Sequence, residues 1–208
     1  MAVAKPPRRR TQAERRARTM SKLAAATIDA IGELGYGAAT TREICERANV
    51  SQGGLFRHFP KRQDLIVAAV LRLYEESLGS LADMVGRLAT GDTVEEFTRV
   101  LVSVRDFLAR PRTMVFLEVI AAARSDPDLR AALGPLLDGH FEAIRAAAVA
   151  SPVIAAMSPA DQLAYIELVQ HDLWVEALWS TVLPWTPDDR KLTVLAQLGI
   201  ALDSALNA

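Results

Sequence analysis

The apolar residues of this 208-residue chain recur at steps of three and four, the spacing that places side chains on one face of an α-helix. The first such series consists of Met20, Ala24, Thr27, Ile31 and Leu34. Gly35 follows its last member, as a glycine that ends a helix commonly does. No stretch alternates convincingly between apolar and polar residues in the manner of a β-strand. The pattern therefore predicts an all-α fold.

A second predicted helix begins at Thr40, which has the spacing of a capping box with Glu43. In that motif the threonine hydroxyl covers one free backbone N–H at the helix start, and the glutamate carboxylate covers another. The helix is expected to run to about Ala48, and Asn49-Val50 is expected to form a tight turn after it.

A third predicted helix follows this turn. Ser51 is a preferred N-cap residue, so we expect it to cap this helix. Val50 and Leu55 have the spacing of a hydrophobic staple around the cap. The helix is expected to end near Phe59, because Pro60 disfavours a helical conformation in the residue before it.

Beyond residue 60 every segment has a helical pattern, with prolines and glycines between the segments. The predicted helices cover about 65–88, 94–110, 112–125, 128–150, 160–183 and 188–206. Gly134-Pro135 is a candidate interruption of the fourth of these. We expect three parts: a basic arm over 1–10, a three-helix domain over 11–60 and a larger helical domain over 61–208.

The charge of the chain is divided between these parts. Residues 1–62 carry thirteen Lys and Arg against five Asp and Glu, a net charge of +8, and residues 63–208 carry eleven against twenty, a net charge of −9. Such a division indicates that the basic part meets a polyanion, although a solvated basic tail is the alternative. The arm, with Arg8-Arg9-Arg10 after two prolines, is disordered by composition.

Several classes of protein are disfavoured by the composition. With Cys45 as the single cysteine, the chain forms no disulfide within itself and no Cys-rich metal cluster. Apolar runs such as Leu65–Leu71 fall far short of the ~18 residues of a membrane span. Lys22 and Asp29 bound an apolar stretch too short for a secretion signal. We therefore expect a soluble cytoplasmic protein with no membrane partner.

An enzyme is also disfavoured. The chain has three histidines and one cysteine, with no Gly-rich phosphate loop and no pair of histidines at the spacing of a zinc-binding helix. We expect no catalytic residues, no metal and no cofactor. A chromosome-associated architectural protein would explain the basic arm, but it would not explain the large acidic helical domain.

The second and third predicted helices, with the tight turn between them, have the framework of a helix-turn-helix, whose second helix enters the major groove of DNA. The residues expected to pack this pair onto the first helix are Ile44, Cys45, Ala48, Val50, Leu55 and Phe59. The residues left to face outward include Arg42, Gln52, Arg57 and His58.

The segment from Thr40 to Lys61 resembles the N-terminal signature of TetR-type transcriptional regulators, and the resemblance spans about residues 12–70. It implies a DNA-binding motif ahead of an all-helical ligand-binding and dimerisation domain. Three positions depart from the family pattern. Phe56 replaces a usual tyrosine and Gly54 a common threonine, which removes two hydroxyls suited to phosphate, and Cys45 replaces a usual alanine.

The expected DNA contacts follow from this motif and from side-chain chemistry. Gln52 and Arg57 have the side chains that read the edges of adenine and guanine. Lys61 stands at a helix start, where a phosphate is attracted both by the lysine and by the free N–H groups. The full expected set is Thr40, Thr41, Arg42, Ser51, Gln52, Gly53, Gly54, Phe56, Arg57, His58 and Lys61.

Other readings of these residues stay open. Thr40 and Ser51 either cap their helices only or also contact phosphate. His58 is a phosphate donor or a packed ring. Adjacent glycines cost about 1 kcal/mol each relative to alanine in a helix interior, so we hypothesise that Gly53 and Gly54 permit a close approach to DNA. The arm at residues 1–10 either enters a minor groove or raises affinity without specificity.

The family resemblance implies that the last two helices form a homodimer interface. The apolar stripes that favour this are Leu163, Ile166, Leu173, Ala177 and Leu178 in one helix and Leu192, Leu195, Leu198, Leu202 and Leu206 in the other. The alternative is that these stripes pack the core of the monomer.

The same resemblance implies a cavity for a small-molecule effector among the middle helices. Its candidate ligand-binding residues are Phe107, Phe116, Glu118, His171 and Trp174, although aromatic residues more often form plain core. The hypothesis from the sequence is a ligand-responsive regulator, most simply a repressor, that binds a palindromic operator in double-stranded DNA as a homodimer. The alternative is a non-specific chromosome-associated DNA-binding protein.

Overall fold

A computed structural model of the chain describes residues 11–89, 91, 93–183 and 188–206. The elements in this part of the chain are all helices, which confirms the all-α prediction. They are α1 (Gln12–Leu34), α2 (Thr41–Ala48), α3 (Gln52–His58), α4 (Arg62–Leu88), α5 (Val94–Leu108), α6 (Pro111–Ala123), α7 (Pro127–Leu137), α8 (His140–Ala148), α9 (Pro152–Ala156), α10 (Pro159–Ser180) and α11 (Asp189–Leu206). The predicted basic arm at 1–10 lies outside the described residues.

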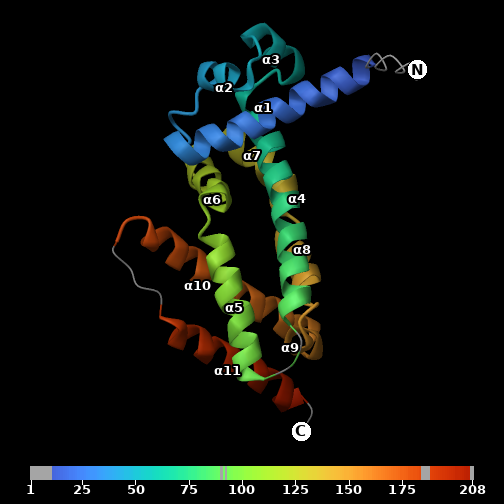
Figure 1. The fold of residues 1–208 in the computed structure, drawn as a ribbon, viewed down its shortest axis with the longest axis vertical. Helices are drawn as coiled ribbons and strands as arrows, with labels where there is room; N and C mark the ends of the chain where they lie inside the picture. The colour runs from blue at the N-terminus through green and yellow to red at the C-terminus, as the bar shows by residue number, and fades with distance from the viewer. Residues whose placement is uncertain (1–10, 90, 92, 184–187, 207–208) are drawn as a thin grey trace, which may run out of the picture.

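The molecule is elongated, with α1, α2 and α3 at one end and α9, α10 and α11 toward the other (Figure 1). The long helix α4 runs between the two ends (Figure 1). No helix in the described part of the chain combines the length and the hydropathy that a bilayer crossing needs.

The first helix begins and ends at local signals. Thr11 and Glu14 form a capping box, in which the Thr11 hydroxyl accepts from the Glu14 N–H and the Glu14 carboxylate accepts from the Thr11 N–H. At the other end Gly35 adopts φ 79°, a conformation that favours glycine, and its N–H bonds to the Ile31 carbonyl. The predicted stop at Gly35 is therefore confirmed, whereas the capping box at Thr11 was not predicted.

The predicted capping box at Thr40 is only half correct. The Thr40 hydroxyl accepts from the Glu43 N–H at 3.2 Å, as expected. The Glu43 carboxylate does not reach back to the cap, because it accepts from the Arg47 guanidinium at 2.7 Å instead. The Thr40 N–H bonds to the Ala38 carbonyl. A charged partner one turn along the helix thus displaces the expected contact.

The region after α6 differs from the prediction in two places. The expected interruption at Gly134-Pro135 is wrong, since Pro135 lies inside α7 and the break falls after Leu137. The Asp138 N–H still bonds to the Gly134 carbonyl, so the last turn closes despite the proline. The short helix α9 was not predicted, because the two Ser-Pro pairs beside it were interpreted only as breaks.

The buried apolar side chains form two clusters. The first joins α1, α2 and α3 to the N-terminal half of α4, to α6 and to α7. Leu65 and Ile66 of α4 are fully buried in it, so the core of the N-terminal end extends past residue 60. The second cluster joins the C-terminal part of α4 to α5, α9, α10 and α11. Trp174 of α10 packs against both clusters.

The leucine stripes predicted for the last two helices serve mainly the monomer core. Leu173 and Leu192 are fully buried, and Ile166 and Ala177 are buried beside them. A different face carries most of the exposed large apolar side chains of the described chain. Its members are Leu168, Val175, Leu178, Trp179, Val182, Leu183, Val194 and Leu198. Leu178 and Leu198 are the two residues that the stripes and this exposed face have in common.

Ion pairs hold these last two helices onto α5. Arg105 of α5 is buried, and its Nη1 lies 2.7 Å from the Asp189 carboxylate at the start of α11. Lys191 of α11 pairs with Glu176 and Asp172 of α10. Because Glu176 is itself buried, loss of Lys191 would leave a buried carboxylate with less compensation. The exposed apolar face is therefore presented by a fixed pair of helices.

Candidate DNA-binding surface and ligand cavity

The predicted tight turn sets the angle between α2 and α3. Asn49 takes the left-handed conformation, with φ 52° and ψ 51°, and caps the end of α2. The Val50 N–H bonds to the Cys45 carbonyl at 3.0 Å. Ile44 and Leu55 are fully buried, one on each helix, so they anchor the pair in the first cluster. The arrangement is that of a helix-turn-helix.

Two arginines fix this unit to its neighbours. Arg47 of α2 pairs with Glu33 of α1 at 2.7 Å. Arg62 at the start of α4 donates to the carbonyls of Tyr36 and Ala39, and its guanidinium lies 4.3 Å from the centre of the Tyr36 ring. The connection between α1 and α2 is therefore held to the start of α4 by a cation–π contact and two hydrogen bonds.

The proposed DNA contacts all lie on α2, α3 and the residues that flank them. Those with exposed side chains or backbone are Thr40, Arg42, Ser51, Gln52, Gly53, Phe56, Arg57 and Lys61. Thr41, Gly54 and His58 are half-buried. None of the eleven is fully buried, so the surface is accessible to a large ligand.

The charged groups of this surface differ in how they are paired. Arg42 donates to Glu46 at 2.9 Å, and both side chains are exposed, so a phosphate would compete with that carboxylate. Arg57 has no ion-pair partner among the described residues. The hydroxyls of Thr40 and Ser51 accept from backbone N–H groups, which leaves each hydroxyl hydrogen available to a phosphate oxygen. The Nδ1 of half-buried His58 has no hydrogen-bond partner in the described chain.

The two adjacent glycines have different surroundings. A Cβ at Gly54 would lie 3.1 Å from Val50 Cγ1 and 3.2 Å from Ser51 Oγ, so a side chain there would require these neighbours to shift by a few tenths of an ångström. A Cβ at Gly53 would meet no atom of the described structure within 4 Å. No contact within the described structure therefore requires glycine at position 53, so a requirement would come from what approaches it.

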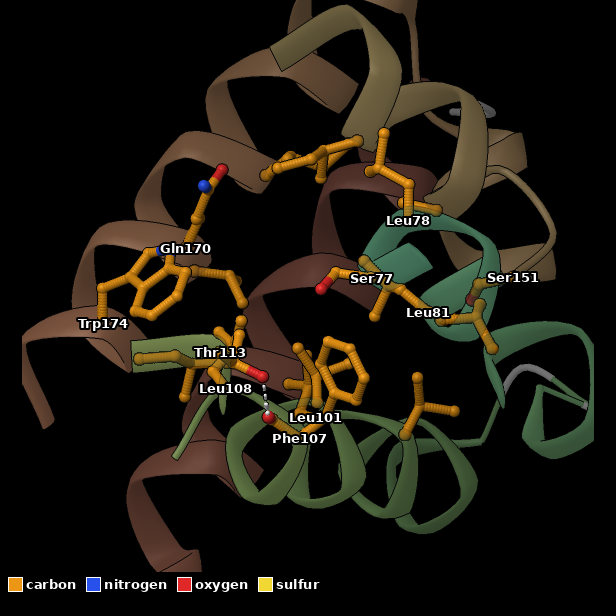
Figure 2. Close-up of a pocket in the computed structure, with 18 of the residues that line it drawn as sticks. Ser77, Leu78, Leu81, Leu101, Phe107, Leu108, Thr113, Ser151, Gln170 and Trp174 are labelled. Carbon is orange, nitrogen blue, oxygen red and sulfur yellow. Dashed lines mark hydrogen bonds between the residues drawn. The ribbon is translucent and has the colours of Figure 1, made fainter. Parts of the chain in front are cut away.

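A cavity of about 130 Å³ lies among residues between Leu73 and Trp174, on the C-terminal side of the helix-turn-helix. Its wall is built by α4, α5, α6, α8 and α10, together with Ser151 and Ile154 (Figure 2). Most of the wall is carbon. Its side chains include Leu81, Leu101, Phe107, Phe116, Ile166 and Trp174.

The structure separates the predicted ligand residues into two groups. Phe107, Phe116 and Trp174 line the cavity. Glu118 and His171 do not line it, and both are exposed. Each lies on the outer side of its helix, since α6 turns Phe116 inward and α10 turns Leu173 inward. Their expected contact with a ligand in this cavity is therefore corrected.

The cavity also brings together polar residues that the sequence did not indicate. Gln170 lines it, and its position three and four residues before Leu173 and Trp174 places it on the inner face of α10. That spacing is a usable signal, because helical periodicity places polar as well as apolar residues on an inner face. His140 lines the cavity from the start of α8. No comparable signal marks it, because its contacts lie far away in the sequence.

A hydrogen-bonded chain links three of these residues. The Tyr74 hydroxyl lies 3.1 Å from His140 Nδ1 and donates to the His140 carbonyl at 3.2 Å. His140 Nε2 lies 2.6 Å from Gln170 Nε2. Burial lowers the pKa of His140, and the nearby His171 lowers that pKa further. The neutral imidazole fits this chain, because its unprotonated Nε2 can accept from the Gln170 amide.

Comparisons with known proteins agree with this geometry. Residues 23–69 match the family model of bacterial regulatory proteins of the tetR family. The HTH-type transcriptional regulator Rv2912c of Mycobacterium tuberculosis is 34% identical over 143 residues, 69% of this chain and 72% of that one. The HTH-type transcriptional repressor KstR of Rhodococcus jostii is 31% identical over 181 residues, 82% of this chain and 74% of that one.

A solved structure supports the fold over most of this chain. The multidrug binding protein EbrR, crystallised with imidazole, superposes with a TM-score of 0.66 over 86% of this chain and 93% of that one, at 22% identity. The relatives that match are transcriptional regulators and none is named as an enzyme, in agreement with the expectation from the sequence.

Proposed function

The chain belongs to the TetR family of transcriptional regulators, and we propose that it is a ligand-responsive repressor that binds a palindromic operator as a homodimer. The observation that carries the proposal is the exposed face of α3, where Gln52 and Arg57 project from a helix that buried anchors hold in place. The likeness to KstR, which is named a repressor, supports repression over activation.

On DNA, α3 would lie in the major groove, with Gln52 and Arg57 at the edges of the bases. Thr40, Ser51 and Lys61 would hold the phosphates on either side. Lys61 stands at the N-terminus of α4, where its own charge and the helix dipole both favour an anion. These contacts would fix the register, and the base contacts would give specificity.

A single reading helix buries too little DNA for strong specificity, so a dimer is needed. The exposed apolar face of α10 and α11 supports an interface there. Val175, Leu178 and Trp179 are each more than half exposed in the monomer, and water contact at so many neighbouring apolar groups is unfavourable. Two such helix pairs would form a four-helix interface with two-fold symmetry, which matches the symmetry of a palindrome.

The ligand would act by changing the distance between the two reading heads. Helices α4 and α6 both line the cavity, and both contact α1. Arg112 of α6 pairs with Asp29 of α1 at 3.5 Å and with Glu76 of α4 at 3.0 Å. A ligand that separates α6 from α4 would move α1 and the helix-turn-helix with it. The ligand must prefer the shape that does not bind DNA, and a coupling of about 1–3 kcal/mol is typical.

A gel-shift titration tests this function directly. The probe is the DNA that flanks the gene for this protein, with unrelated DNA as competitor and a series of salt concentrations. A regulator should prefer its site by roughly a thousandfold or more, so the shift should survive the competitor. Equal loss of the shift with any DNA would favour the alternative, a non-specific chromosome-associated protein.

A further inference from the structure

Several polar groups around the cavity already have partners. The Thr113 hydroxyl donates to the Phe107 carbonyl at 3.1 Å, as the dashed line in Figure 2 marks. The Tyr165 hydroxyl donates to the Leu195 carbonyl at 2.7 Å. Groups engaged in this way contribute little to the choice of a ligand, because they are satisfied before it enters.

Gln170 Oε1 and Ser151 Oγ are the two buried side-chain oxygens of the cavity wall that lack a hydrogen-bond partner in the described chain, and of the two only the amide oxygen is restricted to accepting. Gln170 is 9% exposed, and no group of the described chain donates to its Oε1. The orientation of the amide follows from the hydrogen-bonded chain. Since the Tyr74 hydroxyl donates to the His140 carbonyl, its oxygen accepts from His140 Nδ1–H, and His140 Nε2 accepts from Gln170. The amide oxygen is the group that is left over, and a buried acceptor without a donor is unfavourable.

Four of the rings that line the cavity lie together, and one of them, His140, contacts Gln170. Tyr74, Phe116, His140 and Trp174 form a contiguous group, in which neighbouring ring centres lie 5.4 to 6.2 Å apart and the planes differ by 19° to 37°. Rings in this arrangement offer faces and edges to another planar ring. The wall therefore favours an aromatic ligand over an aliphatic one of similar size.

The charge and the volume of the cavity narrow the class further. Among the described residues no Asp, Glu, Lys or Arg lines the cavity, so an ionised ligand would lose its hydration without a counter-ion. The volume of about 130 Å³ is close to that of an engineered apolar cavity of about 150 Å³ that binds benzene. The space thus suits one six-membered ring with a small substituent.

We propose that the cavity recognises a compact, neutral, phenol-like molecule, whose hydroxyl donates to Gln170 Oε1 while its ring packs against Tyr74, Phe116 and Trp174. The last torsion of a glutamine side chain is broad, so the amide can turn its oxygen toward the ring without a movement of α10. This inference rests on the proposed ligand response and names the chemical class of its effector.

The test compares two probes of nearly equal shape, phenol and toluene, by calorimetric titration of the full-length protein. Gln170→Leu keeps the volume of the side chain and removes the acceptor. We expect this substitution to lower the ratio of phenol affinity to toluene affinity by about tenfold, the worth of one hydrogen bond of about 1.4 kcal/mol. Toluene should bind the variant about as tightly as it binds the wild-type protein, which shows that the cavity is intact.

The matched control is Gln162→Leu on the same helix. Gln162 is also buried, but it does not line the cavity, and both ends of its amide are bonded, to Met157 and Arg145. The ratio should not change in this variant. An unchanged ratio in Gln170→Leu would overturn the proposal, and so would a preference of the wild-type protein for anisole, which lacks a donor, over phenol.

Operator titrations with and without phenol distinguish this proposal from the proposed function. If phenol binds through Gln170 but leaves the affinity for DNA unchanged, the recognition stands and the ligand response fails. If neither ring binds, the proposed recognition is overturned, whereas the ligand response fails only if no ligand changes the affinity for the operator.

Discussion

Gly53 offers a prediction in which stability and DNA binding change in opposite directions. The residue lies in the first turn of α3, and a Cβ added there meets no protein atom within 4 Å. Alanine at an unstrained helical position stabilises a protein relative to glycine, by about 1 kcal/mol in a helix interior and by about half of that in a first turn. For a chain of this size Gly53→Ala should therefore raise Tm by about 1–2 °C.

The expected effect on DNA binding has the other sign. If the glycine permits the backbone of α3 to approach the bases or phosphates, the added methyl group occupies space that the DNA needs. An overpacked contact costs about 1–3 kcal/mol, so operator affinity should fall by about fivefold to 150-fold for each contact. Gly53→Val should lower it further, because the added group is larger.

Calorimetric melting and operator titrations on the same preparations measure both quantities. The matched control is Gly54→Ala, whose Cβ would lie 3.1 Å from Val50 Cγ1 and should therefore fail to raise Tm. Operator affinity that is unchanged in both Gly53 variants would refute the reasoning, since the glycine would then have no role in the approach to DNA.

Three further results are expected. Lys61→Ala should weaken binding to all DNA sequences equally and reduce the slope of log K against log salt by about one unit for each Lys61 in the complex. Arg57→Ala should instead relax the preference at one base position. Equal effects of the two substitutions in a selection from random DNA would contradict these roles. Leu178→Glu with Trp179→Glu should convert the dimer to a monomer without loss of helicity, and a dimer of unchanged mass in sedimentation would contradict the proposed interface. Because burial lowers the pKa of His140 in the folded protein, the unfolded chain binds the proton more readily, so stability should fall as pH drops below about 6.5. In His140→Phe, urea titrations should show a smaller fall in stability over the same pH range. An unchanged pH dependence in this variant would contradict the role of His140.

The DNA-binding end was predictable because its signals are local. The caps at Thr40 and Ser51, the turn at Asn49 and the stop at Gly35 each depend on residues within four positions along the chain. The capping box that failed shows the limit of such signals. Glu43 has two possible partners within the same stretch, and its choice of Arg47 depends also on Glu33, which α1 brings to the other side of that arginine.

The ligand cavity was less predictable because it depends on which side of each helix faces inward. Glu118 lies in an apolar run, yet α6 turns it outward, since Phe116 and Val119 occupy the buried face. The leucine stripes of the last two helices show the same limit. Periodicity finds an apolar face, but it does not tell whether the monomer core or a second subunit covers it. His140 meets Tyr74 and Gln170 only through long-range packing.

The central claim is that two copies of this chain read the two halves of one symmetric DNA site. Selection of bound sites from random DNA, followed by measurement of the mass of the complex, tests it most directly. We expect a palindrome whose half-sites are about one helical turn, or a multiple of it, apart, with the bound protein chains in pairs. A site without symmetry, or one chain bound to each site, would contradict it.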